Sequence, residues 1–159
     1  MMKPSIGVSD ENMDAVVGIL NTLLSDESVL YIKTRNYHWN VVGQMFNDLH
    51  AFFEGQYEIL EDIVDEVAER ARALGGRALG TMAEFIERAR LEEEPGEYPD
   101  DKTMLRNLLS DHEEVGRNLR VDAKKCSSDH GDSVTGELLN ELAPKHEKIA
   151  WMLRSLLEE

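Results

Sequence analysis

The segment between residues 46 and 74 constrains the fold most, because it carries two stripes of side chains at helical spacing. A helix places residues three and four apart on one face, so an apolar stripe must be buried against a core. The apolar stripe contains Phe46, Leu49, Phe53, Leu60, Val64, Val67, Ala71 and Leu74. The second stripe lies about 130° away on the helix and contains His50, Glu54, Asp65 and Glu69. The segment therefore predicts a long helix with a titratable face that points away from its own core.

The rest of the chain also has the pattern of helices with short breaks. Four prolines and the lack of an alternating apolar pattern argue against strands. We predict three more long helices, at residues 9–40, 100–126 and 132–156, and a short helix at 81–91. Four amphipathic helices predict an all-α four-helix bundle in one domain, residues 1–159, with residues 1–8 as a flexible tail. The long connector at 75–99 suits the topology of ferritin-like bundles better than a simple up-down bundle.

The charge of the chain argues against DNA as a partner. Acidic residues number 32 against 17 basic ones, which gives a net charge of −15. Duplex DNA is a polyanion and needs clustered Lys and Arg, whereas the N-terminal tail holds only Lys3. The charge favours attraction of cations, or serves solubility alone.

The apolar segments and the single cysteine bear on the compartment. No apolar run reaches the roughly 18 residues of a membrane span, so no membrane partner is expected. The N-terminus lacks the apolar region of a secretory signal. Cys126 is the only cysteine, which excludes an internal disulfide and a Cys-rich metal site. These features predict a protein of the reducing cytoplasm.

Two histidines and three acids have the residue types and spacing of metal ligands. They are His38, His50, Glu54, Asp65 and Glu69. No acid stands three residues before any histidine, so the Glu-x-x-His pattern of sites inside a bundle is absent. His50 and Asp65 are separated by about 22 Å along a helix, whereas metal–ligand bonds are near 2 Å. One chain cannot bring both ends to one ion, but two antiparallel copies crossing between Ile59 and Leu60 can.

The motifs HWN at 38–40, LH at 49–50, DEVAER at 65–70 and LGG at 74–76 resemble the Dps (DNA-protection-during-starvation) miniferritins. The resemblance implies a ferritin-like bundle, a hollow shell of twelve subunits built from two-fold dimers, and a ferroxidase centre shared between two subunits. In that centre His38, His50 and Glu54 would come from one subunit, with Asp65 and Glu69 from the other. Many family members have Asp where this chain has Glu54, and Glu reaches further. The implied reaction is oxidation of Fe(II), preferably by hydrogen peroxide, with storage of ferric mineral and protection against oxidative stress.

Several other residues have a functional and a plain reading. Trp39 either packs beside His38 or takes up oxidising equivalents. Two roles are open for Asp132, Glu137 and Glu141. The resemblance implies that they line an iron-entry pore, and the plain alternative is helix capping and solvation. Mineral nucleation or plain solvation would explain Glu58, Glu61 and Asp62. We expect buried, structural positions for His112, His146 and Cys126, and a loop position for His130.

Two alternative functions stay open from sequence alone. The first is a shell protein that binds DNA and has little catalytic role, which the net charge disfavours. The second is an assembly without enzymatic activity that binds zinc or manganese, because imidazole and carboxylate ligands also suit those ions.

Overall fold

The computed structural model describes residues 3–158, and this part of the chain holds five α-helices, one π-helical turn and no strand. In chain order these are α1 (Asp10–Asn40), α2 (Phe46–Ala73), α3 (Met82–Arg88), α4 (Asp101–Lys124), the π-turn η1 (Lys125–Asp129) and α5 (Ser133–Leu157). The predicted all-α four-helix bundle with a short connector helix is confirmed. Residues 1, 2 and 159, which belong to the predicted tail and domain, lie outside the described range.

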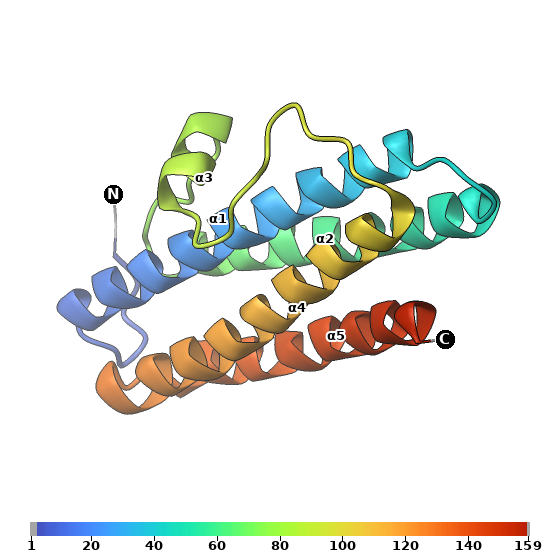
Figure 1. The fold of residues 1–159 in the computed structure, drawn as a ribbon. Coiled ribbons are helices and arrows are strands. Elements are labelled where there is room, and N and C mark those ends of the chain that lie inside the picture. Colours follow the sequence, from blue (N-terminus) through green and yellow to red (C-terminus); the bar gives the residue numbers. More distant parts are fainter. Residues whose placement is uncertain (1–2, 159) are drawn as a thin grey trace.

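The four long helices form two antiparallel pairs. α1 packs along α2, and α4 packs along α5 (Figure 1). The connector between α2 and α4 runs the length of the bundle beside α1, so that α4 starts at the end opposite to where α2 stops (Figure 1). This crossover is what the long connector in the sequence predicts, and it makes α2 and α4 parallel.

Side-chain caps fix the starts of the helices. Ser9, Asp100 and Asp132 each accept a hydrogen bond from a backbone N–H three residues later, which satisfies a donor that has no partner inside the helix. Thr81 and Glu84 form a reciprocal capping box at α3. The predicted helix starts are confirmed by these caps.

α3 and the turn before α5 differ from the sequence prediction. α3 ends at Arg88 instead of residue 91, because Ala89 is extended and the chain then turns so that Arg90 reaches α1. The break predicted between the helices at 100–126 and 132–156 starts too early, because α4 continues into the π-turn as far as Asp129. Gly131, with φ of 68°, then ends the turn in a conformation that favours glycine.

The core follows the apolar stripes with corrections at the helix ends. On α2 the predicted stripe from Leu49 to Leu74 is buried except for Val64, which is partly buried, and Phe46 is 41% exposed. On α5, Val134 and Leu156 have the helical spacing of an apolar stripe but are exposed, and Leu139 is buried. Both exposed residues lie in terminal turns, where the neighbouring helices no longer cover the surface.

By length and composition α1 is apolar enough to cross a membrane. In the bundle, 61% of its most apolar window is buried inside the protein. The same apolar side chains pack against α2 and the connector, so α1 has the contacts of a core helix.

Candidate metal centre

His38 lies near the end of α1, and His50 lies in the second turn of α2. The side chain of each histidine contacts the backbone carbonyl of the other. The Nδ1 atom of His38 lies 2.8 Å from the carbonyl oxygen of His50, and Nδ1 of His50 lies 2.8 Å from the carbonyl oxygen of His38. The two rings stack with centroids 3.8 Å apart. The carbonyl of His38 is one of the last in α1, so it has no partner within that helix and is free to accept this bond.

These contacts determine which ring nitrogens can bind a metal. A carbonyl oxygen only accepts hydrogen bonds, so both Nδ1 atoms must carry the proton. In the neutral imidazole the lone pair is then on Nε2. Hydrogen bonding of the second nitrogen is the usual way in which proteins orient a metal-binding histidine. The pair is therefore prepared to offer two Nε2 ligands before any ion arrives.

Aromatic rings and one arginine surround the pair. Phe46 stacks on His50 at 5.2 Å between centroids, and Tyr57 meets the edge of His38 at 5.3 Å. The guanidinium of Arg35 lies 5.0 Å from the ring centre of Trp39 and 5.2 Å from that of Tyr57. Trp39 itself is 61% exposed. The sequence analysis missed Arg35 and Tyr57, although their helical spacing from His38 and Glu54 puts them beside the site.

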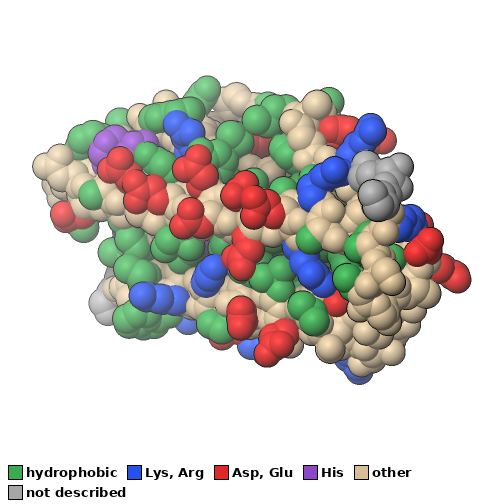
Figure 2. Space-filling view, turned by 180° about the vertical axis from the view of Figure 1, so that it is seen from behind, with side chains coloured by type: hydrophobic (Ala, Val, Ile, Leu, Met, Phe, Trp, Pro, Cys, Tyr) green, Lys and Arg blue, Asp and Glu red, His purple; other side chains and the backbone are tan. Residues whose placement is uncertain are grey.

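The three carboxylates lie on the exposed face of α2. Glu54 accepts a long hydrogen bond of 3.4 Å from the hydroxyl of Tyr57. Asp65 and Glu69 are exposed further along the same helix. Figure 2 shows histidine side chains near one end of the molecule and a row of acidic side chains that continues from them along the same face.

A single chain leaves the two ends of this stripe apart. Within residues 3–158 no three His, Cys, Asp or Glu side chains lie close enough together to hold a metal ion. The structure thus brings together His38 and His50, with Glu54 one turn further on α2, and leaves Asp65 and Glu69 on the far half of α2. This is the separation that the helical spacing predicts.

The residues with weaker predictions fall into two groups. Asp132 is buried, caps α5 and pairs with Arg70 at 3.2 Å, so the capping alternative is confirmed for it. The second group is exposed to solvent and consists of Glu137, Glu141, Glu58, Glu61 and Asp62. The expected burial of His112, His146 and Cys126 is confirmed.

Comparisons with known proteins agree with this architecture. The ferritin-like domain family matches residues 17–159. A low temperature-induced protein of Nostoc sp. is 42% identical over 99% of this chain and 88% of its own length. DNA protection during starvation protein 2 of Bacillus anthracis is 35% identical over 91% of this chain and 97% of its own length.

A solved structure extends the likeness to three dimensions. The Dps protein of Vibrio cholerae O1 superposes with a TM-score of 0.90 at 29% identity, covering 99% of this chain and 98% of that protein. That structure is described as a member of the ferritin-like diiron-carboxylate superfamily. The chain therefore belongs to the ferritin-like family and, within it, to the Dps miniferritins.

Proposed function

We propose that this protein is a ferroxidase, which oxidises Fe(II) with hydrogen peroxide and stores the ferric product as mineral inside a hollow shell of twelve subunits. The observation that carries the proposal is the His38–His50 pair, whose Nε2 atoms are both free, at one end of the carboxylate stripe of α2. Mixed imidazole and carboxylate ligands suit iron. Removal of iron and peroxide together would protect DNA, which fits the names of the relatives.

The proposed site needs two subunits. The spacings from His50 to Glu69 and from Glu54 to Asp65 share one midpoint, between Ile59 and Leu60. A two-fold axis at this midpoint puts His50 and Glu54 of one subunit opposite Asp65 and Glu69 of the other, and forms two such sites at once. Ile59 is 41% exposed in the single chain, so an apolar side chain is available at the crossing point.

The residues divide the chemistry between them. The two imidazoles hold Fe(II), the substrate, without adding charge, and the carboxylates stabilise the higher charge of Fe(III). Oxidation of two Fe(II) ions to Fe(III) supplies two electrons, which together with two protons from the solvent reduce one hydrogen peroxide molecule to two water molecules. Trp39, exposed beside His38, is a candidate for taking up stray oxidising equivalents.

Other exposed acids receive roles outside the oxidation site. We assign nucleation of mineral to Glu58, Glu61 and Asp62, and lining of an iron pore to Glu137 and Glu141. These carboxylates are free to face solvent in the single chain, as such roles require.

The proposal places the protein in the cytoplasm and excludes tight contact with DNA. The net charge of −15 repels a polyanion, so protection of DNA would act through iron chemistry. A retarded band on a gel at low salt that disappears as salt is added would show direct DNA binding instead.

The experiment measures peroxide-driven Fe(II) oxidation and particle mass on the same samples. His50→Ala and Asp65→Ala should each slow oxidation by at least about tenfold, since each removes a ligand. His130→Ala and Asp48→Ala are matched controls outside the stripe and should leave the rate unchanged. Light scattering should give the mass of twelve subunits for all of these proteins.

Two results would reject the proposal. One is a monomer with full activity, because the site would then not need a partner. The other is unchanged oxidation in the double variant His50→Ala with Asp65→Ala. Zinc or manganese bound tightly after purification, without any iron turnover, would support a metal-binding assembly in its place.

A further inference from the structure

Tyr57 of α2 contacts two of the proposed iron ligands at once. Its hydroxyl donates a hydrogen bond of 3.4 Å to Oε1 of Glu54, which lies one turn earlier on the same helix. The rings of Tyr57 and His38 meet at an angle of 81°, with their centroids 5.3 Å apart. One side chain thus touches an imidazole and a carboxylate of the half-site that a single subunit would contribute.

The ring of Tyr57 is held in place by its neighbours on α1. The guanidinium of Arg35 lies 5.2 Å from its centre, and the ring of Tyr31 meets it at 87° with the centroids 6.2 Å apart. Arg35 is fixed in turn, because it donates a hydrogen bond of 2.7 Å to the hydroxyl of Tyr31. A ring packed against a cation and other aromatic rings has little freedom to turn, so its hydroxyl has a defined position.

Glu54 is the flexible member of the half-site. Its side chain is exposed, and it has one more methylene group, and so one more rotatable bond, than the Asp of many family members. Within residues 3–158, the bond from Tyr57 is the one hydrogen bond that this carboxylate makes. A carboxylate that moves freely loses conformational entropy when it binds an ion, and this loss weakens binding. A partner that orients the carboxylate beforehand reduces the loss.

We propose that Tyr57 is a positioning residue of the oxidation site, which holds the Glu54 carboxylate beside the His38–His50 pair before iron binds. The bond uses Oε1 and leaves Oε2 available to iron. Tyr57 acts through Glu54 and does not itself bind the ion, while Arg35 supports its ring. The inference rests on the proposed ferroxidase function and adds to it a residue outside the ligand set.

The test measures Fe(II) binding to the assembled protein by anaerobic titration, and peroxide-driven oxidation on the same samples. Tyr57→Phe keeps the ring and removes only the hydroxyl. It should raise the dissociation constant and the KM for Fe(II) by about 2- to 10-fold, the usual contribution of one hydrogen bond, with a smaller change in kcat. Tyr98→Phe, at an exposed tyrosine of the connector between α3 and α4, is the matched control and should leave binding unchanged.

The background Glu54→Asp separates positioning from a general structural role. The carboxylate of the shorter side chain lies nearer the helix backbone and away from the hydroxyl. Adding Tyr57→Phe to this background should therefore change Fe(II) affinity by less than about twofold, which a double-mutant cycle detects. Light scattering and thermal unfolding should match the parent proteins, because the aromatic ring is retained.

Two results would overturn the positioning role. One is wild-type Fe(II) affinity in Tyr57→Phe, and the other is an equal loss of affinity from Tyr57→Phe in both backgrounds. Either result, with a wild type that binds and oxidises Fe(II), rejects the role of Tyr57 and leaves the ferroxidase proposal standing. A wild type that neither binds nor oxidises Fe(II) rejects both.

Discussion

At the scale of single residues, the histidine pair shows how backbone and side chain determine each other. His38 and His50 each donate a proton to the other's carbonyl, so the turn between α1 and α2 sets the tautomer of both rings. Gly43, with φ of 120°, allows the sharp reversal that brings the two helices into this register. The ligand atoms are held ready because the fold itself makes the bonds that orient them.

Cys126 should be inert in the folded protein. Burial, and then the charges of Asp132 and Asp122, raises the pKa of its thiol to about 12. Since the thiolate is the reactive form, a disulfide reagent at pH 8 should label Cys126 only after denaturant is added. Rapid labelling of the native protein, without loss of helix, would contradict this burial.

Asp111 should contribute more to the stability of the folded state at low pH than at neutral pH, which is opposite to the usual behaviour of a carboxyl group. Burial raises its pKa above the unfolded value, despite the contact with Lys33 at 2.5 Å. The folded state therefore holds this proton at pH values where the unfolded state has lost it, so the contribution is favourable below the unfolded pKa of 3.8 and is lost as pH rises through the folded pKa.

The comparison with Asp111→Asn isolates this group. Denaturant unfolding at pH 4 and pH 7 should show that the wild type gains stability relative to Asp111→Asn as the pH falls. A constant difference between the two proteins across this range would show that Asp111 does not titrate differently in the two states.

At the scale of elements, α2 is the helix whose buried and exposed faces the sequence predicted best. The spacing of its apolar residues predicted the buried stripe, and the same helical geometry predicted that Glu54, Asp65 and Glu69 lie on the exposed face. The faces of α1 were harder to predict, because Asp26 and Glu27 have the residue type of surface positions but are fully buried. Their burial depends on Arg90 and His146, which are far away in sequence, so no local pattern reveals it.

The junction between α4 and α5 also depends on contacts that sequence does not show. At Gly136, an added Cβ would lie 1.9 Å from Oγ of Ser127 and 2.9 Å from the carbonyl oxygen of Ala123. The hydroxyl can rotate away, but the backbone carbonyl cannot move cheaply. The π-turn and the start of α5 therefore need glycine at this position.

A pair of glycine variants tests this packing. Gly136→Ala should destabilise the protein by about 1–3 kcal/mol, from overpacking. Gly116→Ala, in the middle of α4 with open space around the new Cβ, should stabilise it by about 0.5–1 kcal/mol. Chemical denaturation measures both, and a Gly136→Ala protein as stable as the wild type would contradict the close contact.

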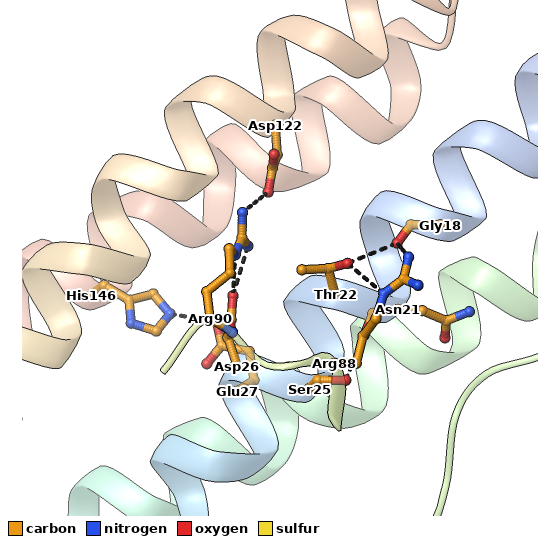
Figure 3. A network of polar contacts seen from close by, with 10 residues as sticks. All are labelled: Gly18, Asn21, Thr22, Ser25, Asp26, Glu27, Arg88, Arg90, Asp122 and His146. Carbon is orange, nitrogen blue, oxygen red and sulfur yellow. Dashed lines mark hydrogen bonds and ion pairs between the residues drawn. The ribbon is translucent and has the colours of Figure 1, made fainter. Parts of the chain in front are cut away.

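At the scale of the whole molecule, the connector fixes how the two helix pairs fit together. Arg88 donates to the hydroxyl of Thr22 and to the carbonyl of Gly18, and Arg90 bridges α1 to α4 through Asp26 and Asp122 (Figure 3). These contacts hold the crossover against α1 and leave the titratable face of α2 uncovered. A face that is polar, ordered and uncovered in one subunit is what a shared site requires.

The central claim is that each oxidation site takes ligands from two subunits, and mixing two inactive variants tests it most directly. His50→Ala and Asp65→Ala subunits, unfolded together and reassembled, should form mixed two-fold dimers. Each mixed dimer has one site with both lesions and one intact site, so random pairing makes about one quarter of all sites intact.

The measurement is peroxide-driven Fe(II) oxidation by the mixed assembly, beside each variant reassembled alone. We predict that the two separate variants stay nearly inactive and that the mixture recovers about one quarter of the wild-type rate. A mixture that forms assemblies of wild-type mass, yet is no more active than its parents, would contradict a site shared between subunits.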